Sequence, residues 1–317
     1  MRQRPFRPEF DVESVARPRQ GVRIHCLSFD MGHSSLTEAA PCSGREIHGK
    51  ISLRRNPPVP PVSLPRIPPP MSEPIAVVLA AGKGTRMESD RPKVLIEVGG
   101  RPMIHYVLDA LAAGGIERSI VVVGYHADDV KRELSNRPQV RFALQEQQLG
   151  TGHAVMMARD QLAGHDGMVM VVAGDSPMLQ SDSVRALLSA FERDRPACLL
   201  GTARKDDPTG LGRVVRDDDG NFVGIVEEKD ATDEQREITE VNMSTYLFNA
   251  VDLLWALDQL RNDNVQGEYY ITDGPGMLKA AGKNVQALDV LRPCEALSIN
   301  NLAELAVVEE EMKKDHA

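Results

Sequence analysis

The sequence predicts an α/β protein with a doubly wound, mostly parallel sheet and a small β-rich part that follows it. The first observation is that short apolar runs alternate with longer amphipathic segments from residue 75 onward. The second is that these runs are continuous, which is typical of strands buried on both faces. The third is composition, because hydrophobic residues make up 42% of the chain and aromatic residues only 4%, as in an aliphatic α/β core.

The chain from residue 75 to about 202 predicts a regular alternation of strands and helices. Strands are expected at 75–79, 119–124, 140–144, 168–173 and 197–202, and helices at 102–113, 127–134, 151–162 and 181–194. The first helix has Pro102 at its start and Gly114–Gly115 after its end, which are the usual boundary signals. In doubly wound sheets ligands bind at the carboxyl ends of the strands, so functional residues are expected in the loops there.

The pattern changes after about residue 203. Two short strands, at 212–216 and 222–226, flank the turn Asp217–Gly220 and predict a β-hairpin. A further strand is expected at 240–248, and helices at 252–261, 271–281 and 301–314. The sequence contains no internal repeat of the kind that builds solenoids.

Residues 1–70 differ in composition from the rest of the chain. They contain 12 of the 21 prolines and 11 Lys and Arg against 6 Asp and Glu, a balance of +5, whereas the whole chain has a net charge of −9. Without sustained periodicity this composition predicts a disordered Pro/Arg-rich extension. Its acidic residues disfavour a transit peptide, and it lacks the apolar core of a secretory signal. We interpret it either as a non-functional tail from an upstream start or as a Pro-rich docking tail, ahead of a domain at 71–317.

The charge and the cysteine content exclude several classes of protein. A net charge of −9 does not favour nucleic acid or an anionic membrane as the partner of the chain. The four cysteines lie far apart with no C-x-x-C pair, which is typical of free thiols in a reducing cytoplasm. No run approaches the ~18 apolar residues of a membrane span, so a cytoplasmic protein is expected.

A glycine-rich loop follows the first expected strand and reads Leu79-Ala-Ala-Gly-Lys-Gly-Thr-Arg-Met87. Its glycines let backbone N–H groups approach an anion, and Arg86 and Lys93 add two positive charges. The spacing matches neither the Walker loop nor the G-x-G-x-x-G dinucleotide loop. The combination suits a nucleoside triphosphate that is cleaved between its α and β phosphates. The alternative is an ordinary Gly-rich turn with two solvated cations.

Two polar residues at the ends of predicted elements are candidate ligands of Mg²⁺, which prefers hard oxygen donors. Asp175 ends the run Val171–Asp175, and Asn300 precedes the last expected helix. Each residue also fits a helix N-cap, so the capping alternative stays open for both.

Other loops combine polar side chains with bare backbone. Gln145 can read the edge of a pyrimidine because its amide both donates and accepts, and Gly150–Thr151 offer backbone amides at a helix start. A polar loop and cap is the alternative there. The segments 207–213, 227–230 and 240–242 contain carboxylates and amides suited to sugar hydroxyls, although each alone is more typical of solvated surface.

Taken in order, these segments resemble the nucleotidyltransferase family that makes nucleotide sugars, most closely the uridylyltransferase domain of the bacterial bifunctional enzyme for UDP-N-acetylglucosamine. The likeness runs from about Ile75 to Asn301 through L-A-A-G-x-G-T-R-M, P-K, Q-L-G-T-G-H-A, G-D, D-D-P-T-G-x-G-R, G-I-V-E-x-K-D-A-T-D-E-Q-R and Q-G-E-Y-Y-I-T-D. It implies a Rossmann-like nucleotidyltransferase fold with a nucleotide-binding part at 71–202, a sugar-binding part at 203–300 and a C-terminal helix at 301–317.

The resemblance also implies a role for each candidate site residue. The nucleotide would be lined by Leu79, Ala80, Ala81 and Gly82, and its phosphates would be contacted by the catalytic residues Arg86 and Lys93. Uracil would be bound by Gln145, Gly150 and Thr151, and Mg²⁺ would be held by Asp175 and Asn300. The amino sugar would be held by Gly212, Glu227 and Asn242. His126 and His153 are interpreted as structural or surface residues, since an ionised phosphate nucleophile requires no general base.

The implied reaction is Mg²⁺-dependent transfer of UMP from UTP to N-acetylglucosamine-1-phosphate, with release of pyrophosphate, as a step toward peptidoglycan precursors of the cell wall. The alternatives are a related enzyme acting on glucose-1-phosphate or another sugar phosphate, and a non-catalytic nucleotide-sugar-binding regulatory subunit. Met243–Ser244 stand where the family usually has Thr-Gly, so the sugar pocket is expected to differ. Hexapeptide repeats of an acetyltransferase half are missing, so that activity is expected on a separate protein.

Overall fold

The computed structural model describes residues 71–83, 90–264, 266–297, 299 and 301–315. These residues belong to one compact unit of the chain, Arg66–Ala317. The extension predicted at 1–70 lies outside the described residues, and so do the candidate site residues Arg86 and Asn300.

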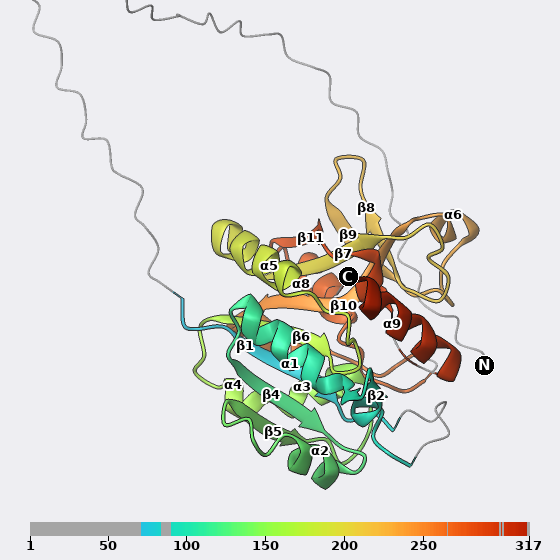
Figure 1. Ribbon diagram of the computed structural model, residues 1–317. Coiled ribbons are helices and arrows are strands. Elements are labelled where there is room, and N and C mark those ends of the chain that lie inside the picture. The colour runs from blue at the N-terminus through green and yellow to red at the C-terminus, as the bar shows by residue number, and fades with distance from the viewer. Residues whose placement is uncertain (1–70, 84–89, 265, 298, 300, 316–317) are drawn as a thin grey trace, which may run out of the picture. The chain divides into compact units, whose positions relative to one another are not determined.

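Within the described part of the chain, nine strands form one sheet, and a two-stranded ribbon stands apart from it. The sheet contains β1 (Ile75–Ala80), β4 (Arg118–Val123), β5 (Val140–Leu144), β6 (Met168–Ala173), β7 (Cys198–Arg204), β8 (Arg213–Arg216), β9 (Phe222–Val226), β10 (Glu240–Asn249) and β11 (Val285–Asp289), and the ribbon contains β2 (Glu97–Val98) and β3 (Arg101–Pro102). The order across the sheet is β11-β7-β10-β6-β1-β4-β5, from the upper to the lower edge of the view in Figure 1, and β8 pairs with β10 and β9.

Most neighbouring strands in this order are parallel. The pairs β1–β4, β1–β6, β4–β5 and β7–β11 are parallel, whereas β10 is antiparallel to both β6 and β7. The chain reaches β10 from the antiparallel hairpin β8–β9 and not through a long crossover helix, and its direction is reversed accordingly. The predicted fold class is therefore confirmed.

Helices cover both faces of this sheet (Figure 1). The helices are α1 (Met103–Gly114), α2 (Ala127–Glu133), α3 (Thr151–Met156), α4 (Arg159–Leu162), α5 (Ser181–Asp194), α6 (Asp233–Arg236), α7 (Ala250–Gln259), α8 (Asp273–Ala280) and α9 (Leu302–Asp315), with the short 3-10 helices η2 (Lys93–Leu95) and η3 (Pro293–Ala296). Helices α1 and α5 pack on one face, and α3, α7 and α8 on the other.

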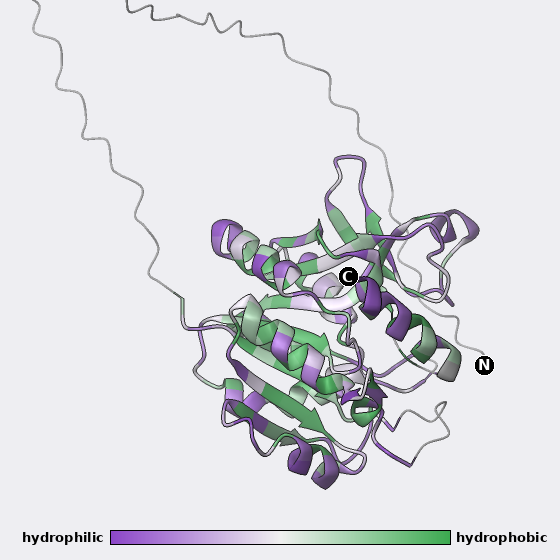
Figure 2. Cartoon of the chain, viewed as in Figure 1, coloured by the Kyte–Doolittle hydropathy of each residue, from purple (hydrophilic) through white to green (hydrophobic). Residues whose placement is uncertain are grey.

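The two hydrophobic cores follow from the alternation of side chains along each strand. In β1, Ala76 and Val78 belong to the core beneath α1 and α5, whereas Ile75 and Val77 belong to the core beneath α3 and α7. Because both sets are buried, the strand reads as a continuous apolar run. Figure 2 shows the same arrangement, with hydrophobic strands in the middle and hydrophilic residues on the outer surfaces of the helices.

The structure corrects one predicted helix and adds elements that local patterns did not predict. The helix expected at 151–162 is two helices, because the backbone tightens where Ala158 N donates to Val155 O at 3.0 Å and the chain turns before α4 begins. The edge strand β11 was missed, since its run Val-Gln-Ala-Leu-Asp is only partly buried and mixes polar with apolar residues.

The last helix covers a small third core. Val308 of α9 is buried with Val98 and Met103, and Glu309 accepts a hydrogen bond from Gly99 N at 3.2 Å.

In the described part of the chain no helix is long and apolar enough to span a membrane. Cys198 and Cys294 are not disulfide-bonded, whereas Cys26 and Cys42 lie outside the described residues.

The carboxyl ends of the parallel strands meet at one edge of the sheet, and backbone hydrogen bonds join the loops that leave it. Gly174 N, just after β6, donates to Leu79 O in β1 at 2.8 Å, and Gln145 N, just after β5, donates to Val123 O in β4 at 2.8 Å. These loops contain several of the residues that the sequence analysis singled out, among them Ala81, Gly82, Gln145, Gly150 and Asp175.

Candidate active site

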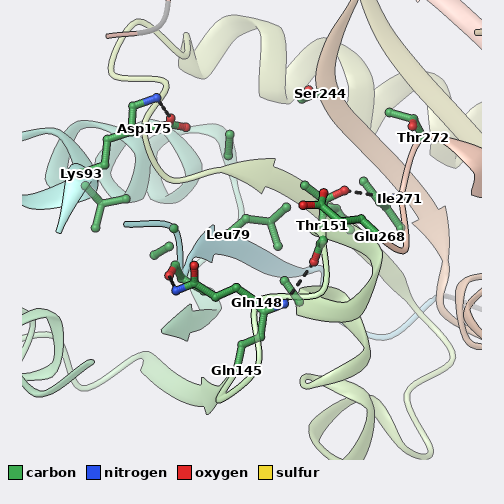
Figure 3. Close-up of a pocket in the computed structure, with 18 of the residues that line it drawn as sticks. Leu79, Lys93, Gln145, Gln148, Thr151, Asp175, Ser244, Glu268, Ile271 and Thr272 are labelled. Carbon is green, nitrogen blue, oxygen red and sulfur yellow. Dashed lines mark hydrogen bonds and ion pairs between the residues drawn. The ribbon is translucent and has the colours of Figure 1, made fainter. Parts of the chain in front are cut away.

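A cavity of about 370 Å³ opens at this edge of the sheet. Its walls are Leu79, Ala80, Ala81, Gly82, Lys93, Val94, Gln145, Gln148, Gly150, Thr151, Ala154, Val171, Ala173, Asp175, Ser244, Tyr246, Glu268, Ile271 and Thr272. Nine of the predicted site residues are among them, from Leu79 at the first strand to Asp175 after the fourth parallel one. Figure 3 shows Lys93 and Asp175 at one end of the cavity and Ser244, Glu268 and Thr272 toward the other.

Lys93 and Asp175 form an ion pair at one end of the cavity (Figure 3). Lys93 Nζ lies 2.5 Å from Asp175 Oδ2, and the two side chains are 15% and 24% exposed. Lys93 begins η2, whose next two residues, Val94 and Leu95, are buried in the core. This anchoring fixes the base of the lysine side chain beside the loop Leu79–Gly82.

Asp175 reaches the cavity because Gly174 precedes it. A Cβ atom on Gly174 would lie 2.9 Å from Leu79 O, so the strand end can approach β1 only with glycine there. The capping alternative for Asp175 is wrong, since α5 begins at Ser181 and its N-cap residue is Gln180. Near the last helix it is Asn301 that accepts a hydrogen bond from Glu304 N, at 2.9 Å.

Gln145 lies in the wall of the cavity with 4% of its surface exposed. Its amide nitrogen donates to Gly150 O at 3.1 Å and to Nδ1 of His153 at 3.0 Å. His153, which was interpreted as structural or surface, therefore touches a candidate binding residue directly. A hydrogen-bond network of this kind does not appear in the sequence pattern, although the motif Q-L-G-T-G-H-A contains His153 and begins three residues after Gln145.

The loop that follows Gln145 docks on a distant segment at 268–272. Leu149 O accepts a hydrogen bond from Tyr269 N at 2.8 Å, and Gly152 N donates to Tyr269 O at 2.7 Å. Gly150 has φ +103°, and a Cβ atom there would lie 2.5 Å from Tyr269 O. The close approach of these two backbones thus requires glycine at 150.

Several cavity residues were not singled out by the sequence analysis. Gln148 donates from Nε2 to Ala81 O at 2.8 Å, and Ile271 donates from its backbone N–H to Oγ1 of the predicted residue Thr151 at 3.1 Å. Glu268 and Thr272 come from the segment Q-G-E-Y-Y-I-T-D, which was quoted for the resemblance without assigning roles to its residues.

The three residues expected to hold a sugar form their own cluster beside the cavity. Asn242 N donates to Gly212 O at 2.8 Å, and a Cβ atom on Gly212 would lie 3.4 Å from Glu227 Oε2. Tyr246, a cavity residue, donates from its hydroxyl to Asn242 Oδ1 at 3.0 Å and so joins the cluster to the cavity. The amide nitrogen of Asn242 is then the group that can donate to a ligand.

Glu227 and Glu240 differ in whether their carboxylates are available to a ligand. Glu227 is exposed, but loss of water around its carboxylate raises its pKa, as do the charges of Asp230 and Asp273. Glu240 was considered as a sugar-binding carboxylate, and this interpretation is wrong: it is buried and accepts from Thr202 Oγ1 at 2.6 Å and from Arg216 Nε at 2.7 Å.

Of the two residues that depart from the family pattern, Ser244 reaches the cavity. It lies in an irregular part of β10, where the pairing with β7 shifts between Asn242 and Thr245. Its φ is +51°, in the left-handed region that favours glycine. Met243, in contrast, is 9% exposed and packs in the core.

Asp175 is a hard oxygen donor of the kind that Mg²⁺ prefers. No group of three or more His, Cys, Asp or Glu residues suited to a metal occurs among the described residues. Mg²⁺, however, is usually held by one or two carboxylates together with phosphate oxygens and water. A single carboxylate beside the glycine-containing loop Leu79–Gly82 therefore fits this ion when it arrives with a nucleotide.

Parallel strands that end in a glycine-containing loop, a lysine, a carboxylate and a cavity of about 370 Å³ are typical of proteins that bind nucleotides. A family model agrees with this class. The chain belongs to the family described as the MobA-like NTP transferase domain, whose model matches residues 76–264. The resemblance found in the sequence is thereby confirmed.

Three relatives are similar to about three quarters of this chain. The bifunctional protein GlmU of Halalkalibacterium halodurans is 43% identical over 244 residues, which are 77% of this chain and 53% of that protein. GlmU of Pelotomaculum thermopropionicum is 45% identical over 239 residues, 75% of this chain and 52% of that protein. GlmU of Streptococcus equi subsp. zooepidemicus is 41% identical over 245 residues, which are 76% of this chain and 53% of that protein. The chain thus spans about half the length of the curated relatives it matches.

Proposed function

We propose that this protein transfers UMP from UTP to N-acetylglucosamine-1-phosphate and releases pyrophosphate and UDP-N-acetylglucosamine. The observation that supports it most is the meeting of Lys93, Asp175, the loop Leu79–Gly82 and Gln145 in one cavity. Phosphoryl-type transfer depends on alignment and charge neutralisation more than on covalent catalysis, and this cavity contains groups for both.

In this proposal the nucleotide lies along the carboxyl edge of the sheet. The uracil ring enters the part of the cavity walled by Gln145, Gly150 and Thr151, and the phosphates lie toward Leu79–Gly82 and Lys93. Arg86 is proposed as a second phosphate contact, as the resemblance implies, although it lies outside the described residues.

Asp175 is the described residue that would hold Mg²⁺, and Asn300 is proposed as a second ligand although it too lies outside the described residues. The ion would neutralise phosphate charge and align the α-phosphate with its leaving group. Lys93 adds a fixed positive charge beside the same phosphates and holds the Asp175 carboxylate in place through their ion pair.

The sugar phosphate would occupy the side of the cavity next to Gly212, Glu227 and Asn242. Glu227 can accept hydrogen bonds from sugar hydroxyls, and Asn242 Nδ2 can donate one to a carbonyl or hydroxyl oxygen. The attacking oxygen belongs to a phosphate that is already ionised at neutral pH, so the reaction requires no general base.

A second candidate is the same transfer to glucose-1-phosphate or another sugar phosphate. It is favoured by Ser244, which adds a hydroxyl to the cavity wall where the family usually has glycine.

We further propose that the product enters cell wall precursor synthesis in the cytoplasm and that acetyl transfer takes place on a separate protein.

The test is pyrophosphate release by the full chain from UTP, CTP, ATP and GTP, each combined with N-acetylglucosamine-1-phosphate and with glucose-1-phosphate. We expect the highest kcat/KM with UTP and N-acetylglucosamine-1-phosphate, loss of turnover on chelation of Mg²⁺, and its return when Mg²⁺ is added back. Asp175→Ala should be inactive, while Asp128→Ala, which removes a surface aspartate with a 94% exposed side chain, should retain activity. Absence of pyrophosphate from every combination would refute the proposal.

A further inference from the structure

We infer that His153 is a positioning residue that fixes the amide orientation of Gln145 and thereby makes the cavity prefer uracil over cytosine. This inference rests on the proposed use of UTP. His153 belongs to α3 and is half-buried, and it does not line the nucleotide cavity itself. It acts on the base through the side chain of Gln145.

The orientation of the Gln145 amide follows from its partners. The carbonyl oxygen of Gly150 can only accept a hydrogen bond, so the group that faces it at 3.1 Å must be the amide nitrogen. The same nitrogen lies 3.0 Å from Nδ1 of His153. Both amide protons are then used inside the protein, and the oxygen is the atom of this side chain left to meet a ligand.

The same contact fixes the protonation of His153. Because the amide nitrogen of Gln145 donates, Nδ1 must accept, and the neutral ring then has its proton on Nε2. The ring lies beside that of Tyr269, with 6.3 Å between centroids. Tyr269 is itself bonded through its backbone to Leu149 and Gly152. The imidazole is therefore held from a second side.

The amide oxygen of Gln145, which is left to meet a ligand, distinguishes uracil from cytosine at ring position N3. Uracil has an N–H at this position and can donate to the Gln145 oxygen, whereas N3 of cytosine is an acceptor and would face a second acceptor. An amide rotated by half a turn would present N–H groups and reverse this preference. Gly150 O and His153 Nδ1 together oppose that rotation, because it would place the amide oxygen against two acceptors.

Replacing His153 should therefore weaken the choice between bases more than it weakens catalysis. In His153→Ala one of the two groups that hold the amide is gone, and we expect the UTP/CTP ratio of kcat/KM to fall about fivefold, as for loss of one neutral hydrogen bond. In His153→Asn the side-chain oxygen stands near the place of Nδ1 and can accept the same bond, so the ratio should stay near that of the unchanged protein. Rescue by Asn separates positioning from simple packing.

The ratio is measured by pyrophosphate release from UTP and from CTP with one sugar phosphate, using the full chain and both variants at matched folded concentration. An unchanged ratio in His153→Ala would overturn the inference, and so would an equal fall in His153→Asn. If the unchanged protein uses UTP with no preference over CTP, the inference also falls while the transferase proposal stands.

A second measurement is independent of turnover and of the variants. In protein labelled with ¹⁵N-histidine, long-range ¹H–¹⁵N spectra identify the protonated ring nitrogen of each histidine. We expect His153 to have its proton on Nε2 at neutral pH, and a proton on Nδ1 would overturn the inference. If the protein releases no pyrophosphate from UTP at all, the proposed function fails, but this spectrum still tests the contact between His153 and Gln145.

Discussion

Lys93 and Asp175 meet in the cavity although one begins a short 3-10 helix and the other follows a buried strand. Both side chains are largely shielded from solvent, so their attraction is less screened than that of a surface pair. The same shielding strengthens the attraction of Lys93 to a phosphate that enters the cavity.

Replacing Lys93 with alanine should reduce transition-state stabilisation without unfolding the protein. We expect a loss of about 3 kcal/mol in kcat/KM, by comparison with removal of one fixed electrostatic group in other enzymes. The comparison is made on pyrophosphate release, with Lys131→Ala as the control because Lys131 makes a surface pair with Asp128. A loss below about 1 kcal/mol would argue against a catalytic role.

Ser244 is expected to cost stability because of its left-handed backbone conformation. Such a conformation costs a side-chain-bearing residue about 1–2 kcal/mol, whereas glycine adopts it freely but loses more chain entropy on folding. Ser244→Gly should therefore raise the free energy of unfolding by about 0.5–1 kcal/mol. Ser244→Ala, which keeps the backbone cost, should not. Denaturant unfolding of both variants decides between these outcomes, and a less stable glycine variant would contradict the explanation.

Among the elements, the loop between β5 and α3 was predicted to bind the base. The contact of this loop with residues 268–272 was not predicted. Local patterns report burial and backbone preference, whereas this contact joins two segments that are far apart in the sequence. The break between α3 and α4 and the edge strand β11 also escaped prediction, because the break is a local tightening of the backbone at Ala158 and β11 mixes polar with apolar residues.

Gly150→Ala should separate the two backbones of this loop contact. The new Cβ would meet Tyr269 O at 2.5 Å in addition to the cost of a positive φ. Gly164→Ala is a matched control, because Gly164 also has a positive φ but no heavy atom within 4 Å of the added Cβ. We expect the control to lose about 1 kcal/mol of stability from backbone strain alone. Gly150→Ala should lose more than the control and should also raise the KM for UTP. Equal effects of the two substitutions on stability and KM would rule out a special role for the contact.

Glu240 joins three strands of the sheet, with partners Thr202 in β7 and Arg216 in β8. Burial alone would raise its pKa, but the hydrogen bonds from Arg216 and Thr202 outweigh burial and lower it. A lowered pKa means that the carboxylate stabilises the fold above its ordinary pKa of 4.5 and that this contribution is lost as the pH falls through the lowered value.

Glu240→Gln should therefore destabilise the protein at neutral pH by about 3 kcal/mol, as expected when one partner of a buried pair is removed. The difference from the unchanged protein should shrink as the pH falls from 4.5 toward the lowered pKa of Glu240, because the glutamate is protonated first in the unfolded chain and only at the lower end of this range in the folded protein. Thermal unfolding across this range measures it, with the exposed Glu237→Gln as control. A constant difference at every pH would show that packing and not charge is responsible.

For the whole molecule, the sheet strands come from residues 75–289 and the cavity walls from residues 79–272. A chain that begins at Met71 should thus keep the melting temperature and the transferase activity of the full chain. Calorimetry and pyrophosphate release on both forms test this. A clear loss of activity in the shorter form would mean that residues 1–70 contribute to the site.

The amino-acid sequence alone was sufficient for the α/β class, the positions of most strands and helices, and the family. These depend on local apolar periodicity, on glycine and proline signals and on short motifs, all of which are properties of neighbouring residues. Tertiary structure alone decided that Glu240 is buried against Arg216, that Ser244 and not Met243 faces the cavity, and that His153 holds Gln145. The reason is physical: hydrogen bonds and ion pairs between distant segments depend on how strands and loops pack in space, and a linear pattern does not record that packing.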